Sequence, residues 1–187
     1  MNINFGFDWV ILILFLAALI YTMKVIKSEK NKVLKDGVLF KLGNIELLVP
    51  PWWSATTNTS EELIFERTDT RYDWKGTFKC LAPPAEPLDL QQYFIDLIKE
   101  KKLLLDESHA YTPAETLHLD HRILHIESTA TFEGVERVYY DAYLAFEPTA
   151  RQLYYFESLS SVLNGMIEGP YFEGAAKEFK KVESLKD

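Results

Sequence analysis

The hydrophobic positions of the chain form one long uninterrupted run and several short periodic ones. Residues Trp9 to Met23 are uncharged and almost wholly apolar, and Val10 to Ile20 shows no polar face at helical spacing. These fifteen residues make a helix of about 22 Å. A bilayer core is about 30 Å thick, so the span must extend to about Ile26. The pattern predicts a transmembrane helix over residues 9–26.

The residues that flank this run indicate an orientation. Trp9 and Tyr21 lie where aromatic rings are favoured at membrane interfaces, and no base precedes the run. Basic residues that flank a span tend to remain on the cytoplasmic side. We therefore expect an external tail (1–8), a basic juxtamembrane stalk (27–36) and a soluble cytoplasmic domain (37–187) at the inner cell membrane. The alternative places the domain on the periplasmic or external face. The lysines that follow the run are Lys24, Lys27, Lys30, Lys32 and Lys35.

Two other interpretations of the apolar run fit the sequence less well. A cleaved signal peptide has a basic leader and a small-residue cleavage site, whereas residues 1–8 contain an acid and no base. A core helix of a soluble domain shows a polar face, which this run lacks. Both comparisons favour a helix retained in the membrane.

Beyond Gly37 the apolar positions recur with the short periods of a globular domain. Val38–Leu42 and Ile45–Val49 flank Gly43 and Asn44, a pair suited to a tight hairpin turn. From His121 onward, apolar and polar residues alternate, which predicts an antiparallel meander of three strands. Strands are predicted at 38–42, 45–49, 63–67, 77–81, 121–132, 138–146 and 153–156, with a loop over Ser54 to Ser60.

Two further segments have helical spacing. An apolar stripe begins at Leu90 and recurs at Tyr93, Phe94, Leu97 and Ile98. Asp89 is a suitable N-cap, and Gln92 is placed to answer it in a capping box. A closing helix is predicted over 172–185, after an irregular segment that contains Gly165, Gly169 and Pro170. Taken together, the segments predict an α+β domain in which helices pack on an antiparallel sheet.

Charge and cysteine content narrow the function classes. The chain has 20 basic and 28 acidic residues, of which four bases and two acids precede Val33, so the domain is acidic. An acidic domain repels phosphate backbones, which makes nucleic acid an unsuitable partner and leaves the lysine cluster as the expected contact with the lipid bilayer. Cys80 is the only cysteine, which excludes an intramolecular disulfide and a multi-cysteine metal site.

The order of elements resembles the PsbP-like and DcrB-like α/β sandwich. The resemblance is carried by Ile-Glu-Leu-Leu-Val-Pro-Pro-Trp-Trp, the helix at Leu88 to Lys102, the meander, and Gly-Pro-Tyr-Phe-Glu near the end of the chain. It covers about Val38 to Leu185. The group includes photosystem subunits, a Ran-binding import factor, DcrB-type proteins and Eag chaperones, so it implies a non-enzymatic binding module. The chain differs from periplasmic members in lacking a lipoprotein cysteine near the start.

Few residues suggest chemistry. His118, Asp120, His121, His125 and Glu127 include suitable zinc ligands, and His121, His125 and Glu127 share one strand face. The simpler interpretation is a wet face of the sheet. The acids Glu61, Glu62, Glu66, Asp69 and Asp73 have no calcium-loop spacing, Cys80 lacks a general base, and Ser158, Ser160 and Ser161 lack a nucleophile elbow. We expect no cofactor.

Aromatic residues off the predicted core faces are the candidates for a partner surface, unless a second helix layer covers them. They are Trp52, Trp53, Tyr139, Tyr143 and Tyr154. The leading hypothesis is a membrane-tethered interaction module that serves as accessory subunit, adaptor or chaperone of a membrane protein complex. The alternatives are an immunity or chaperone protein that masks an apolar effector segment, and a membrane-anchored metal-dependent hydrolase that uses the histidine cluster.

Overall fold

The computed structural model describes residues 5–67, 73–83, 89–106, 113–118 and 121–181. The chain divides into two compact units, residues 1–37 and 38–187. Asp69, Asp120, Val182 and Leu185, and the side chains of Lys30 and His118, lie outside the described residues.

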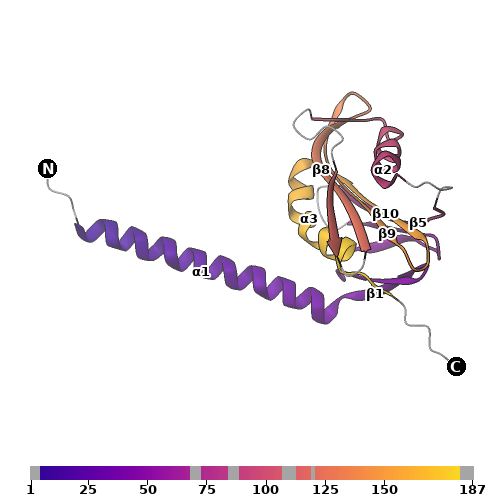
Figure 1. The fold of residues 1–187 in the computed structure, drawn as a ribbon. Coiled ribbons are helices and arrows are strands. Elements are labelled where there is room, and N and C mark those ends of the chain that lie inside the picture. The colour runs from indigo at the N-terminus through magenta and orange to yellow at the C-terminus, as the bar shows by residue number, and fades with distance from the viewer. Residues whose placement is uncertain (1–4, 68–72, 84–88, 107–112, 119–120, 182–187) are drawn as a thin grey trace. The chain divides into compact units, whose positions relative to one another are not determined.

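The first unit consists of one long helix, α1 (Phe5–Asp36) (Figure 1). It continues beyond the apolar run, and the Gly37 amide donates to the Val33 carbonyl just past its end, at 2.8 Å. Its described side chains from Trp9 to Val25 are all exposed, with Leu14 at 65% and Ile20 at 54%. No helix within the described part of the chain is long and apolar enough to cross a membrane.

The second unit begins with the predicted hairpin. Strands β1 (Val38–Leu42) and β2 (Ile45–Val49) pair antiparallel, and β11 (Lys180–Lys181) adds to the other side of β2. Gly43 has φ +55°, and a Cβ there would lie 2.9 Å from Cys80 Sγ. Glycine is therefore required for both the turn and the close approach of the hairpin to Cys80.

A larger antiparallel sheet forms the centre of this unit. The strands are β3 (Ser54–Asn58), β4 (Glu62–Glu66), β5 (Trp74–Leu81), β6 (Leu103–Leu105), β7 (Ala114–His118), β8 (His121–Phe132), β9 (Glu136–Glu147) and β10 (Gln152–Ser160). Their order in the sheet is β3-β4-β5-β10-β9-β8-β6, and β7 also pairs with β8. The predicted meander is confirmed as β8, β9 and β10.

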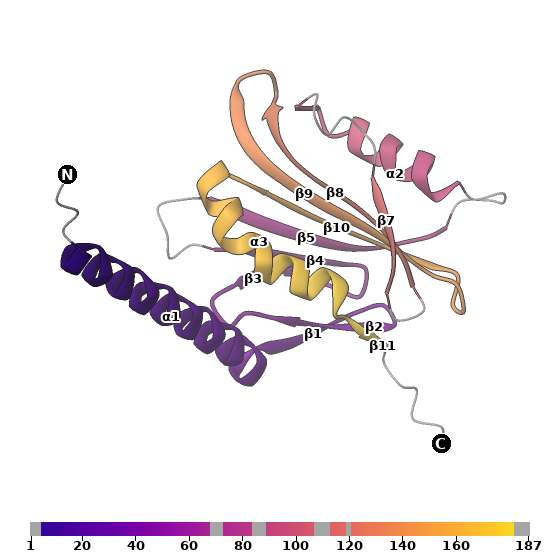
Figure 2. The same ribbon diagram turned by 60° about the vertical axis from the view of Figure 1, so that its left-hand side comes forward.

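Each face of the large sheet carries one helix (Figures 1 and 2). Helix α2 (Leu90–Lys99) packs Phe94 and Ile98 against the face that includes Ile126, Tyr140 and Tyr155. On the opposite face lies α3 (Val162–Lys177), whose Phe172 and Ala176 belong to a second core with Phe78 and Phe156. Because both faces are covered, the alternating residues of β8 and β9 are buried on either side.

The structure differs from the sequence predictions at three places. Residues Ser54–Asn58 form a strand rather than a loop, because a polar, exposed edge strand lacks the apolar alternation that marks an inner one. The short strands β6 and β7 were not predicted. Helix α3 begins at Val162 and includes Gly165 and Pro170, where an irregular segment was expected, and it ends at Lys177. Packing against the sheet therefore overrides the low helix propensity of these residues.

Candidate functional site

The aromatic surface expected from the sequence does not form. Trp53, Tyr143 and Tyr154 are 5%, 1% and 1% exposed, because α3 and the β1–β2 hairpin cover that side of the large sheet. Tyr139 is half-buried and lies against Gly165, where a Cβ would approach its ring to 2.3 Å. Trp52 is also half-buried, with its ring edge-on to Tyr171 at 5.1 Å.

The histidine face is occupied by internal contacts. His121 is 4% exposed and stacks on Phe179 at 4.9 Å. His125 stacks on Tyr143 at 4.2 Å, and its Nε2 lies 2.8 Å from Asp141 Oδ1. Tyr139 donates its hydroxyl hydrogen to Glu127. Among the described residues, no group of three or more acids, histidines or cysteines has the arrangement of a metal site.

Burial controls protonation along this face. It raises the pKa of Asp141, an effect that His125 opposes and that Glu127 and Glu173 reinforce. Burial also raises the pKa of Tyr139, with a further contribution from its hydrogen bond to Glu127. The face therefore holds neutral phenols next to the Asp141–His125 pair, which joins β9 to β8.

Cys80, Ser158 and Ser160, which the sequence analysis considered as nucleophiles, are partly or fully buried in the domain. Burial raises the pKa of the Cys80 thiol, and Glu61 adds to this, so the thiol is protonated at neutral pH. Ser158 and Ser160 are 1% and 5% exposed on the strand face that α3 covers. Their local environments favour a core role over nucleophilic chemistry.

A buried carboxylate that the sequence did not single out joins three segments of the domain. Glu168 of α3 is 0% exposed. Its Oε2 accepts from the indole nitrogens of Trp53, at 2.8 Å, and Trp52, at 3.3 Å, and its Oε1 binds the Arg67 guanidinium. The guanidinium also lies over the Trp52 ring at 5.9 Å. This cluster, the Glu168 clamp, ties α3 to the end of β4 and to the Pro-Pro-Trp-Trp turn.

A groove lies partly on the face of the large sheet that α2 covers only in part and partly at the end of the sheet where β10 passes into α3. Two adjoining cavities of about 510 and 260 Å³ form it, and they share Lys75, Phe132 and Leu159. We refer to both together as the sheet groove. The smaller cavity, the Lys101 end, is lined mainly by apolar groups that include Ile64, Leu103 and Tyr140.

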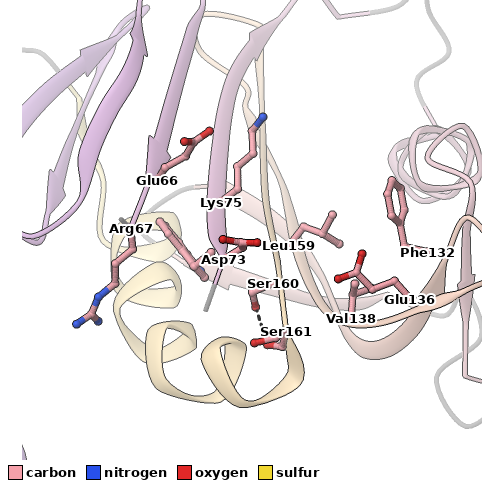
Figure 3. A pocket seen from close by; sticks show the side chains of 11 residues that line it. Glu66, Arg67, Asp73, Lys75, Phe132, Glu136, Val138, Leu159, Ser160 and Ser161 are labelled. Carbon is pink, nitrogen blue, oxygen red and sulfur yellow. Dashed lines mark hydrogen bonds between the residues drawn. The ribbon is translucent and has the colours of Figure 1, made fainter. Parts of the chain in front are cut away.

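The larger cavity, the Ser161 end, lies where β10 passes into α3 (Figure 3). Trp74, Ser160 and Ser161 line it, and Ser160 Oγ donates to the Ser161 carbonyl at 3.0 Å. Arg67 also lines it, but Figure 3 shows its guanidinium pointing away from the other labelled side chains, and this group binds Glu168. The Glu168 clamp thus supports the wall of this end.

The two ends of the sheet groove differ in charge. At the Lys101 end, Lys101 pairs with Glu157 at 2.8 Å and Lys79 pairs with Glu62 at 2.9 Å. At the Ser161 end, Glu66, Asp73 and Glu136 line the cavity with Lys75, while the Arg67 guanidinium is bound to Glu168. The acids of the Lys101 end are therefore paired with lysines, whereas acids outnumber the bases at the Ser161 end once Arg67 is neutralised by Glu168.

No signal in the sequence marks this groove. Its floor uses residues from β4, β8 and β10, which are far apart along the chain, and its existence depends on how much of the sheet α2 covers. The Glu168 clamp has one signal in the sequence, the two adjacent tryptophans of the Pro-Pro-Trp-Trp segment. Indole nitrogens that become buried require acceptors, so a buried carboxylate near this segment could have been expected.

Comparison with known proteins gives a likeness in fold. No family model matches the chain, and no curated protein matches it in sequence. The solution structure of cyanobacterial PsbP (CyanoP) from Synechocystis superposes with a TM-score of 0.58 at 11% identity, over 78% of this chain and 92% of that one. The domain has a PsbP-like α/β fold. This confirms the predicted fold class for the domain.

A second solved structure shares the PsbP-like fold. It is a protein of unknown function, PA94, from Pseudomonas aeruginosa, with a TM-score of 0.51 at 9% identity, over 79% of this chain and 99% of that one. At such identities the likeness establishes the architecture, and the residues of the sheet groove must be interpreted from their own chemistry.

Proposed function

We propose that this protein is a non-enzymatic accessory or interaction module, held at a membrane by α1, and that its sheet groove binds a segment of a partner protein. The observation that carries the proposal is the incomplete cover of the sheet by α2. Ile64, Phe132 and Leu159 are left half-buried between charged side chains, which is the composition of a recognition surface with an apolar centre and a polar rim.

The fold supports this class of function. Members of the PsbP-like group mostly serve as adaptors, chaperones or accessory subunits, and the groove offers a partner both apolar contact and charged groups. The titratable residues singled out on the histidine face and at Cys80 contact other side chains within the domain. A binding role uses the groove without requiring them.

The composition of α1 supports the tether. Its described side chains from Trp9 to Val25 are exposed, and an apolar helix without a polar face requires lipid or another apolar surface around it. The run over residues 9–26 is at the short end of what a bilayer requires, and Lys24 reaches the headgroups by extending along the helix. The lysines that follow favour a cytoplasmic domain.

Site-specific photocrosslinking in native membranes tests the binding role. A photoreactive residue replaces Leu159 or Ile64 in the sheet groove, and a matched control replaces Thr116, which is exposed on β7. We expect a discrete crosslinked product from both groove positions and none from Thr116. Groove positions that give only uncrosslinked protein would refute the proposed function.

Membrane extraction tests the tether separately. The full chain should stay with membranes in alkaline carbonate and require detergent for release. Replacing both Ile13 and Ala17 with lysine should move it to the soluble fraction, because charges at the centre of a span are costly. A reporter active on only one side of the membrane, fused after Asp187, then reads the orientation, with activity expected on the cytoplasmic side.

A further inference from the structure

The outer side of α3 carries apolar side chains that the domain leaves uncovered. Leu163, Met166 and Ile167 are 51%, 66% and 48% exposed, and Pro170 is exposed one turn further on. Residues at these spacings lie on one face of a helix. The inner side of α3 is apolar too, because Phe172 lies in the core. A helix that is apolar all round is normally covered on every side, so the outer face indicates a further partner.

A glycine continues this row one turn beyond Pro170. A Cβ at Gly174 would meet no other part of the described domain within 4 Å, so the domain itself does not require glycine there. Glycine weakens a helix relative to alanine, but it allows another chain to approach the backbone closely. The row therefore projects at its first residue and is shallow at its last. It consists of Leu163, Met166, Ile167, Pro170 and Gly174, and we call it the outer stripe.

The outer stripe is complementary to itself when two copies of α3 pack antiparallel. With Leu163 opposite Gly174 of the second copy, the projecting side chain fills the shallow place, and the two-fold axis repeats this contact. The same register sets Met166 opposite Tyr171, and a thioether packs favourably against an aromatic ring. A parallel pair would instead set leucine against leucine and glycine against glycine, which crowds one end and leaves the other open.

The charges near the stripe suit the antiparallel arrangement. The first turn of α3 contains no acidic residue, and its N-cap Ser161 makes no capping hydrogen bond through its side chain. Glu178 is exposed at the other end of the helix, and antiparallel packing brings it near the N-terminus of α3 in the second copy, where a carboxylate is favourable. Glu173, beside the stripe, pairs with Lys177 of the same helix at 2.7 Å. Charge therefore does not hold two copies apart here.

We propose that two copies of this chain associate through an antiparallel contact of their outer stripes. Each stripe supplies fewer residues than the roughly 20–30 on each side of a stable complex, so the contact is reversible. The tether proposed above confines the copies to one surface, which raises their effective concentration and favours such a contact. The inference goes beyond the proposed function, because no residue of the stripe lines the sheet groove.

Cysteine crosslinking between full-length copies in broken cells tests the contact and its direction. Each variant has one cysteine in a Cys80→Ala background, and two variants with different epitope tags are produced together. Copper phenanthroline should link Leu163→Cys to Gly174→Cys, because these positions lie opposite each other. It should link neither variant to itself, because like positions are then eleven residues apart along the pair, about 16 Å.

A control and two further changes complete the test. Val135→Cys should give no product with either variant, although Val135 is apolar and 87% exposed on the β8–β9 turn. Met166→Glu in both partners should slow crosslinking about tenfold with an unchanged unfolding midpoint. Its carboxylate would be buried against the second copy but exposed in the single domain. Glu178→Gln should slow crosslinking roughly two- to fivefold, the range for a charge near a helix terminus.

The possible products distinguish the arrangements. Links of each variant to itself, without links between the two, would show parallel packing and refute the proposal. Links from the stripe only to a different protein would assign the stripe to that partner and also refute it, as would the absence of any product from folded variants. The photocrosslinks from Leu159 and Ile64 do not depend on these outcomes, so the proposed function is tested separately.

Discussion

At the scale of single residues, Glu168 connects stability to the sheet groove. Its side chain is 0% exposed and that of its ion-pair partner Arg67 is 19% exposed, so neither charge is well solvated. Two indole donors also depend on the carboxylate. Removing one partner of such a cluster leaves the others buried without their counterpart, which is the costly case for a buried ion pair.

Glu168→Ala should therefore lower the free energy of unfolding by about 3–5 kcal/mol. The measurement is urea unfolding of the full chain in detergent. Glu173→Gln is the matched control on the same helix, because Glu173 pairs with Lys177 at an exposed position and its loss should cost at most about 0.5 kcal/mol. Equal effects of the two changes would show that the Glu168 clamp does not stabilise the fold.

Glu147 should make the stability depend on acid. Its burial raises the pKa, but hydrogen bonds from Lys181 and from the Ala150 and Thr149 amides outweigh burial and lower the pKa to about 2 from 4.5. The ionised form thus favours the folded state. Its contribution is complete above pH 4.5 and is lost as the pH falls towards 2.

The stability difference between the native chain and Glu147→Gln should follow the same pH range. It should be constant from pH 7 to about 5 and shrink towards zero near pH 2. Thermal unfolding across this range measures it. A difference that stays constant down to pH 2 would show that Lys181 and the turn amides do not hold the carboxylate ionised.

At the scale of elements, α2 is capped by one residue of the two that the sequence suggested. Asp89 accepts from the Gln92 amide at 3.0 Å, as predicted, whereas the Gln92 side chain donates to Asp96 at 2.8 Å instead of completing a capping box. Asp89→Ala should therefore cost about 1 kcal/mol, and Gln92→Ala at most about 0.5 kcal/mol. If chemical denaturation gives equal losses of stability for the two variants, the Gln92 side chain does take part in a capping box.

In helix α3, replacing Gly165 or Gly174 with alanine should change the stability in opposite directions. A Cβ at Gly165 would lie 2.3 Å from the Tyr139 ring, so Gly165→Ala should destabilise the domain by about 1–3 kcal/mol through overpacking. At Gly174 a Cβ meets nothing within 4 Å, so Gly174→Ala should stabilise it by up to about 1 kcal/mol. Thermal shifts of the same sign for both variants would contradict the close approach of α3 to β9.

At the scale of the whole molecule, no residue of the two hydrophobic cores comes before Phe40 in the chain. A chain that starts at Val38 should therefore keep the unfolding midpoint and cooperativity of the domain in the full chain, and should remain in solution without detergent. Urea unfolding followed by tryptophan fluorescence compares the two. A shortened chain that unfolds without a cooperative transition would show that residues 1–37 contribute to the fold.

The alternation of apolar residues determined much of the fold from the sequence. It located the β1–β2 hairpin, the meander and α2, because the side-chain periods of strands and helices follow from backbone geometry. It missed β3, whose polar residues pair only through the backbone, and the start of α3, where glycine and proline oppose helix formation locally. The candidate site was missed almost entirely, since Ile64, Phe132 and Leu159 meet only after the strands pair.

The sequence by itself therefore determined the apolar run of α1, the acidic character of the domain and its α+β class, because each is a property of composition or of local periodicity. The tertiary structure alone decided that Trp53, Tyr143 and Tyr154 are buried, that Glu168 binds two indoles and Arg67, and that a groove remains beside α2. These features depend on contacts between segments that are distant in the sequence. The pattern of apolar and polar residues along the chain does not show which part of the sheet each helix covers.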